Sequence, residues 1–134
     1  MKLSTTLLKL FLILSFIMLM GCDQDENFEE LAPYRSYTAL LSQQGAEDPV
    51  ATVLENTSNL TIIWSRIGAG KYLGTLSQPI NMDKSTLLVS TPPTHAIMRI
   101  RFNNPTEIYL EAIQGINAYT DNYTSVSLEF KEYK

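Results

Sequence analysis

The strongest constraint on the fold is a two-residue alternation of apolar and polar side chains that recurs along the chain. Near the C-terminus, Val126, Leu128 and Phe130 alternate with Ser127 and Glu129. Because successive side chains of a β-strand point to opposite faces of its sheet, this pattern predicts a strand with one buried face. No stretch after residue 21 shows a sustained 3.6-residue apolar period, so the chain is predicted to be all-β.

Three further segments show the alternation. Residues 96–102 place Ala96, Met98, Ile100 and Phe102 on one face, with Arg99 and Arg101 on the other. Residues 108–112 predict a buried face of Ile108, Leu110 and Ala112 and an exposed face with Tyr109 and Glu111. In residues 60–65, Leu60, Ile62 and Trp64 form one set, but Ile63 on the other face is apolar as well. Apolar residues on both faces predict a central or covered strand with Trp64 buried.

Turn-forming residues separate the predicted strands. About eight short strands are expected, over residues 34–43, 51–56, 60–65, 71–76, 86–90, 96–102, 108–112 and 126–131. Between them lie runs rich in Gly, Pro, Asn, Asp and Ser. Gly68 and Gly70 lie in one of these turns, where both can adopt positive φ. The spacing of about ten residues predicts an antiparallel β-sandwich or partly closed barrel over residues 34–134.

The first 22 residues have a different composition. Residues 1–9 carry two lysines and residues 10–20 are apolar. Such a run is too short for a bilayer-spanning helix, which needs roughly 20 residues, and the pattern is typical of a signal peptide. The sequence Leu19-Met20-Gly21-Cys22 resembles the lipobox of bacterial lipoproteins, and Cys22 is the only cysteine. This resemblance implies that residues 1–21 are cleaved and that Cys22 is lipidated.

The expected partners follow from the anchor and the charge. Several acyl chains on Cys22 would hold the protein on a membrane permanently. Loss of Lys2 and Lys9 with the signal peptide changes the formal net charge from −4 to about −6. This acidic balance argues against nucleic-acid binding, which requires Lys and Arg clustered along a face. With Cys22 occupied by lipid, no disulfide is expected.

An acidic segment follows the anchor. Residues 23–30 contain five acidic side chains and one aromatic ring, so we predict a flexible tether over residues 22–33. A plain spacer is one interpretation. The run also resembles the surface-export signal of Bacteroidota lipoproteins, whereas Asp23 alone resembles an inner-membrane retention signal of enterobacterial lipoproteins. We expect a cell-envelope protein on the outer membrane, with the periplasmic and cell-surface orientations both open.

A second resemblance covers the centre of the chain. Residues 51–57 and 63–76 are similar to a small all-β domain of uncharacterised Bacteroidota and phage proteins. The resemblance implies a β fold and carries no activity and no functional residue.

Catalytic patterns are weak. Gly70-Lys71 has Ser65 where a phosphate loop needs its first glycine, and Tyr72 where it needs Ser or Thr. The only histidine, His95, has no nucleophile-elbow pattern to support a triad. Glu107 and Glu111 are the acid pair to weigh for glycoside cleavage, but charged residues on an exposed sheet face are ordinary. We therefore predict no enzymatic activity, with an envelope hydrolase as the least favoured alternative.

Metal and cofactor patterns are similarly sparse. Asp121 and Asn122 could offer oxygen ligands to calcium. Yet the sequence contains no CxxC, no histidine cluster and no Asp-x-Asp loop beyond the tether. No metal and no cofactor are predicted.

The aromatic residues suggest a binding role. Tyr119 and Tyr123 flank a polar turn that contains Asp121, and Tyr109 is predicted to lie on an exposed face. Exposed rings stack on sugars and anchor protein interfaces, so these four residues are the candidate ligand-binding set. Packing of the rings against the sheet is the alternative. The leading hypothesis is a non-catalytic module that binds a glycan or a protein. The alternative is an architectural envelope lipoprotein or an accessory subunit of a surface complex.

Overall fold

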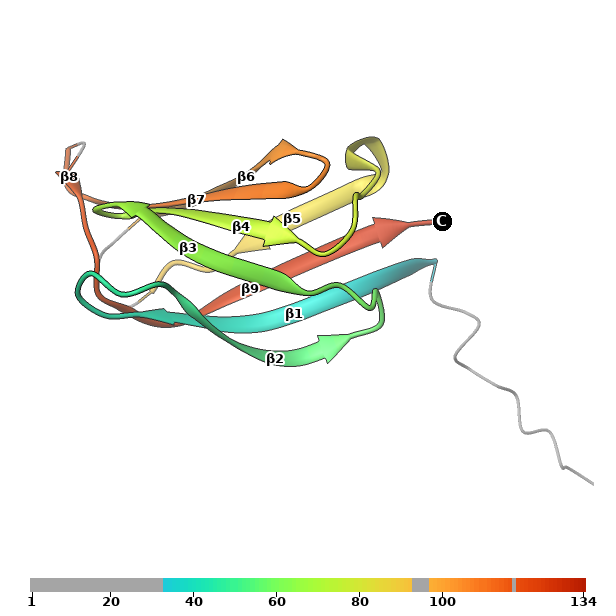
Figure 1. Cartoon of the computed structure of the whole chain (residues 1–134), viewed down its shortest axis with the longest axis horizontal. Helices are drawn as coiled ribbons and strands as arrows, with labels where there is room; N and C mark the ends of the chain where they lie inside the picture. The colour runs from blue at the N-terminus through green and yellow to red at the C-terminus, as the bar shows by residue number, and fades with distance from the viewer. Residues whose placement is uncertain (1–32, 93–96, 117) are drawn as a thin grey trace, which may run out of the picture. The chain divides into compact units, whose positions relative to one another are not determined.

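The computed structural model describes residues 33–92, 97–116 and 118–134, which form two antiparallel β-sheets (Figure 1). The predicted signal peptide, the predicted lipidation site Cys22 and all of the predicted tether but its last residue lie outside the described residues. His95 and Ala96 lie outside them as well. Within the described ranges, no helix is long and apolar enough to cross a membrane.

Nine strands build the two sheets. Sheet A has the order β2-β1-β9-β5, from β1 (Tyr34–Gln43), β2 (Val50–Asn56), β5 (Ser85–Val89) and β9 (Tyr123–Tyr133). Sheet B has the order β3-β4-β7-β6, from β3 (Ile62–Gly68), β4 (Lys71–Leu76), β6 (Ile97–Asn104) and β7 (Glu107–Gln114). The two-residue strand β8 (Ala118–Tyr119) pairs with the end of β7, and a short 3-10 helix η2 (Met82–Lys84) precedes β5. The predicted all-β antiparallel sandwich is confirmed, and the sheets do not close into a barrel. The sequence did not predict β8.

The alternating residues of both sheets form one core. Val126, Leu128 and Phe130 of β9 are fully buried, as the alternation predicts, and so are the inward residues of β7. On β6, Met98 is buried, whereas Ile100 and Phe102 are partly buried against the same core. The weaker burial on β6 follows from its position at the edge of sheet B.

Strand β3 differs from the prediction in one respect. Leu60, Ile62 and Trp64 face the core as expected, and Trp64 is 5% exposed. However, β3 is an edge strand of sheet B, and Ile63 on its outer face is 67% exposed. The prediction of a central or covered strand is therefore wrong. Apolar residues on both faces of β3 predicted that both faces would be packed against other elements. Only the inner face is buried in the core.

Trp64 lies opposite Gly74 across the β3–β4 ladder. A methyl group added at Gly74 would come within 3.0 Å of the indole ring. The ring therefore occupies the space that a side chain at Gly74 would need. This arrangement makes Trp64 the main filler of the core at this edge of sheet B.

Replacement of Trp64 by alanine should lower the free energy of unfolding by about 3 to 5 kcal/mol, because a large buried side chain leaves a cavity. The adjacent Ile63→Ala is the matched control and should cost less than about 1 kcal/mol, since Ile63 points to solvent. Urea denaturation of both variants measures the difference. Equal losses in the two variants would contradict the assignment of the inner and outer faces of β3.

Candidate functional site

The structure separates the four residues predicted to bind a ligand. Tyr109 and Tyr119 lie on the outer face of sheet B, which is the face turned away from the core. Asp121 lies in a polar network between three turns, and Tyr123 lies in the core. The four residues therefore do not form one exposed patch.

Tyr123 is 2% exposed, so the predicted exposure of its ring is wrong. Strict alternation backwards from Val126 would turn Tyr123 outward. The pairing of β1 with β9 instead shifts register next to Tyr123, and Ser125 adopts a φ of +53°. This β-bulge adds one residue and turns the Tyr123 ring inward, where it packs edge-to-face on Tyr72 at 5.5 Å. Tyr123 thus contributes packing and is not available to a partner.

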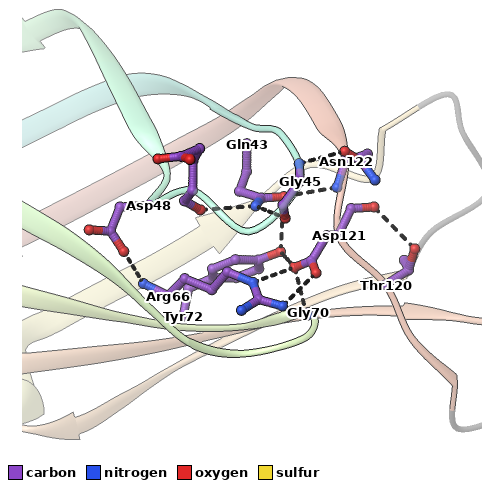
Figure 2. A network of polar contacts seen from close by, with 10 residues as sticks. Gln43, Gly45, Asp48, Arg66, Gly70, Tyr72, Thr120, Asp121 and Asn122 are labelled. Carbon is purple, nitrogen blue, oxygen red and sulfur yellow. Dashed lines mark hydrogen bonds and ion pairs between the residues drawn. The ribbon is translucent and has the colours of Figure 1, made fainter.

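Asp121 is the centre of a network that we call the polar latch: Gln43, Arg66, Tyr72, Asp121 and Asn122 (Figure 2). The Arg66 guanidinium donates to both carboxylate oxygens of Asp121, at 3.2 Å from Nε and 2.9 Å from Nη2. The Tyr72 hydroxyl donates to Asp121 Oδ1 at 2.6 Å, and the Gly70 N–H donates to the same oxygen at 2.9 Å. Asp121 therefore ties the segment before β9 to the β3–β4 hairpin.

The other half of the latch reaches the β1–β2 turn. Gln43 is buried, and its Nε2 donates to the carbonyls of Gly45 and Glu47 at 2.8 and 3.0 Å. Its Oε1 accepts the N–H of Asn122 at 2.8 Å, and Asn122 Oδ1 accepts the N–H of Gly45 at 2.7 Å. The latch consequently fastens three turns that are far apart in sequence at one end of the sandwich.

These contacts shift the pKa values of the latch. The hydrogen bond from Arg66 is the largest cause that lowers the pKa of Asp121, to about 2, and those from Tyr72 and Gly70 lower it further. Burial, with the neighbouring Asp121 carboxylate, raises the pKa of the Tyr72 hydroxyl far above its usual range. Asp121 is thus firmly ionised, with three donors on Oδ1 and one on Oδ2. The calcium role considered for Asp121 and Asn122 has no support, because donors already occupy their oxygens.

Gly70 lets the hairpin approach this region closely. It adopts a φ of +59°, and a Cβ at this position would lie 2.5 Å from the Ala112 carbonyl oxygen and 2.6 Å from the Thr120 N. Gly70 O accepts the Ala112 N–H at 2.8 Å, and Ala112 O accepts the Thr120 N–H at 3.0 Å. The expected positive φ is confirmed at Gly70, while Gly68 does not adopt it.

The latch and these backbone contacts fix the position of Tyr119 on the outer face of sheet B. Tyr119 immediately precedes Thr120 and Asp121, both of which are held. Tyr119 is 41% exposed, and its hydroxyl donates to Glu111 Oε1 at 3.1 Å. The hydrogen bonds of Asp121 therefore contribute to the position of Tyr119, two residues earlier in the chain.

The strand register defines the rest of the outer face of sheet B. Residues that face each other in adjacent antiparallel strands share a face, so the ladder gives two rows across β4, β7 and β6. The first row is Leu73, Tyr109 and Arg101, and the second is Lys71, Glu111 and Arg99. In the first row, Tyr109 lies between Leu73 and Arg101. In the second row, the acidic Glu111 lies between the basic Lys71 and Arg99.

Cations cover both tyrosine rings of this face. Lys71 Nζ lies 4.2 Å from the centroid of the Tyr119 ring, and the Arg101 guanidinium lies 4.5 Å from that of Tyr109. Such pairs hold the long basic side chains flat against the sheet. The face therefore presents basic groups on an aromatic support. The sequence placed Arg99 and Arg101 on this face, but it gave no sign of Lys71, whose contribution depends on the pairing of β4 with β7.

The two acids weighed for glycoside cleavage lie on the outer face of β7, and both accept hydrogen bonds from neighbouring side chains. Glu107 and Glu111 are four residues apart on the extended strand β7, which separates their Cα atoms by roughly 13 Å. Glu107 Oε2 accepts hydrogen bonds from Asn103 and Asn104, so both acids already have partners. In the part of the chain that the structure describes, no three His, Cys, Asp or Glu side chains gather closely enough to hold a metal.

Comparison of the chain with protein-family models, with curated proteins and with solved structures gave no match. The candidate site therefore rests on the geometry of this chain alone.

Asp121→Asn should lower the free energy of unfolding at pH 7 by about 1 to 2 kcal/mol, because the partly solvated Arg66 loses its charged partner. The carboxyl pKa is lower in the folded state than the usual value of 3.8, so its contribution is complete above pH 4 and is lost as pH falls towards 2. Urea midpoints between pH 7 and 2 should therefore converge for the wild type and the variant. Asp83→Asn, at an exposed site, is the control. A gap that stays constant down to pH 2 would contradict the role of the Asp121 charge.

Gly70→Ala should destabilise the fold far more than Gly45→Ala. Both glycines have positive φ, at +59° and +55°, so the backbone strain of roughly 1 to 2 kcal/mol is shared. Only Gly70 lacks room for a Cβ, whereas nothing lies within 4 Å of one at Gly45. We expect a further loss of at least about 2 kcal/mol at Gly70, measured by thermal or urea unfolding. Similar losses at both sites would mean that the hairpin does not approach β7 as closely as described.

Proposed function

We propose that this chain is a non-catalytic binding module of the cell envelope, which uses the outer face of sheet B to hold a glycan or protein partner. The observation that carries the proposal is the pair of cation-covered tyrosines, Lys71 with Tyr119 and Arg101 with Tyr109, on the same outer face of sheet B. Preorganised aromatic and basic groups lose little conformational entropy on binding.

The charge of this face favours an anionic partner. Lys71, Arg99 and Arg101 outnumber Glu107 and Glu111 on this face, although the chain as a whole is acidic, with a formal net charge of −4. Arg99 and Arg101 are exposed, and a guanidinium can hold a carboxylate or phosphate by two parallel hydrogen bonds. We therefore propose a partner that carries such groups, with an acidic glycan as the first candidate.

The location is part of the same proposal. The lipobox-like sequence that ends at Cys22 supports cleavage after residue 21 and a lipid anchor at Cys22. We propose the outer membrane as the site of this anchor. The acidic tether would then allow the module to reach partners beyond the membrane surface. A membrane-held binding module needs no cofactor, and none is proposed.

Electrophoresis in a native gel that contains polygalacturonate tests the binding face, with dextran as the neutral comparison. The wild-type chain should be retarded by the acidic polymer, and the double variant Arg99→Ala/Arg101→Ala should lose most of this retardation. The double variant Arg35→Ala/Lys84→Ala removes the same charge elsewhere, since Arg35 pairs with Glu132 and Lys84 ends η2. It should keep the retardation.

Equal loss in both double variants would show that net charge alone governs retention, and it would contradict a specific face. Absence of retardation for the wild type would contradict the acidic-glycan proposal.

A further inference from the structure

Strand β2 is an edge of sheet A (Figure 1), and within residues 33–92, 97–116 and 118–134 it is left almost wholly exposed. Its segment Val50–Asn56 has no lysine, no proline and almost no burial, and Val50, Val53 and Leu54 are 68%, 49% and 61% exposed. Edge strands usually carry charges, prolines or a cover that prevents pairing with another chain. An open strand of this composition is a template for a further strand.

The three other edges are less open. On the free side of β3, the Asp48 carboxylate accepts the backbone N–H of Arg66 at 2.6 Å. This N–H is therefore not available to another strand. Strand β5 is short and lies beside β6 of the other sheet, and β6 carries the exposed Arg99 and Arg101. The other edges also carry exposed apolar residues, such as Ile63, but β2 is the edge that combines them with backbone groups left open along the strand.

The free backbone groups of β2 can be assigned from its pairing with β1. Ser36 directs its N–H and C=O towards the segment after β2, where they meet Thr57 and Ser58. Because these groups alternate along an antiparallel strand, Leu40 and its partner Thr52 face each other in the same way. Ala51 and Val53 consequently direct their N–H and C=O groups to the open side.

From this pattern we propose that β2 pairs with β2 of a second copy of the chain, antiparallel and with the two-fold axis at Thr52. In this register Ala51 of each copy faces Val53 of the other, so each such pair exchanges two hydrogen bonds. Sheet A then continues from one copy into the next, and the same surface serves both copies, as in a closed two-fold dimer. The proposal does not depend on the binding role of sheet B.

The side chains of β2 favour a second copy over a foreign strand. With the axis at Thr52, Val50 faces Leu54 of the other copy, so the most exposed apolar residues cover each other. The acidic residues do not meet, because Glu55 faces Pro49 and Asp48 faces Asn56. The β-bulge next to Ala39 leaves Leu54 without a partner in β1. This irregularity lies outside residues 51–53, which form the proposed hydrogen bonds between the two copies.

Cysteine cross-linking of the full chain tests this register. In a Cys22→Ser background, Thr52→Cys should form a disulfide-linked dimer on mild oxidation, because the two Thr52 Cα atoms would be about 4.5 Å apart, within disulfide range. Thr86→Cys is the matched control, since Thr86 is also an exposed threonine on an edge strand of sheet A. It should stay largely monomeric in a non-reducing gel.

Light scattering of the full chain in detergent gives an independent readout. Leu54→Lys should halve the protein mass from dimer to monomer, and Leu88→Lys should leave the dimer intact. Both leucines are 61% exposed on edge strands of sheet A, so the control matches in exposure and in charge added. Thermal midpoints should verify that both variants remain folded.

A wild-type monomer, equal cross-linking at Thr52 and Thr86, or equal loss of mass in the two lysine variants would each overturn the proposal. A strand from another protein as the natural occupant of β2 would give the first of these results.

Discussion

The ionised carboxylate of Asp121 makes the interactions that hold together the end of the sandwich beside the proposed binding face. It accepts hydrogen bonds from Arg66, Tyr72 and Gly70 and so joins the β3–β4 hairpin to the segment before β9. Asp121 is partly buried, and withdrawing a charge from water is costly unless it is hydrogen-bonded. Here both carboxylate oxygens are engaged, and the low pKa of Asp121 reflects these contacts. The latch thereby fixes three turns that the hydrophobic core alone would leave loose.

The proposed binding face is a consequence of this arrangement. Tyr119 belongs to a strand of only two residues, which could not hold its place by sheet hydrogen bonds alone. The adjacent Thr120 and Asp121 are fixed from both sides, because Gly70 allows the hairpin to approach the Ala112 carbonyl and the Thr120 N–H. A structural network at the end of the sandwich thus presents an aromatic ring, with Lys71 above it, on the neighbouring sheet face.

The two proposals concern opposite parts of the molecule and need different physics. On the outer face of sheet B, charged and aromatic side chains would select a partner, and the backbone is already paired. At β2 the backbone N–H and C=O groups would make the contact. The side chains need only be apolar and fit those of a second β2 related by a two-fold axis at Thr52. Because β2 belongs to sheet A, pairing there leaves the outer face of sheet B free.

The sequence by itself determined the strands and the residues that face the core. Alternation at period two depends only on strand geometry, and for that reason Val126, Leu128, Phe130 and Trp64 are buried as predicted. The tertiary structure decided what the alternation cannot encode. The β-bulge at Ser125 turned Tyr123 into the core, because one extra residue reverses the alternation beyond it. The edge position of β3 and the role of Asp121 depend on which strands and turns become neighbours. Those contacts join residues as far apart as Gln43 and Asn122, and local patterns carry no information on such pairs.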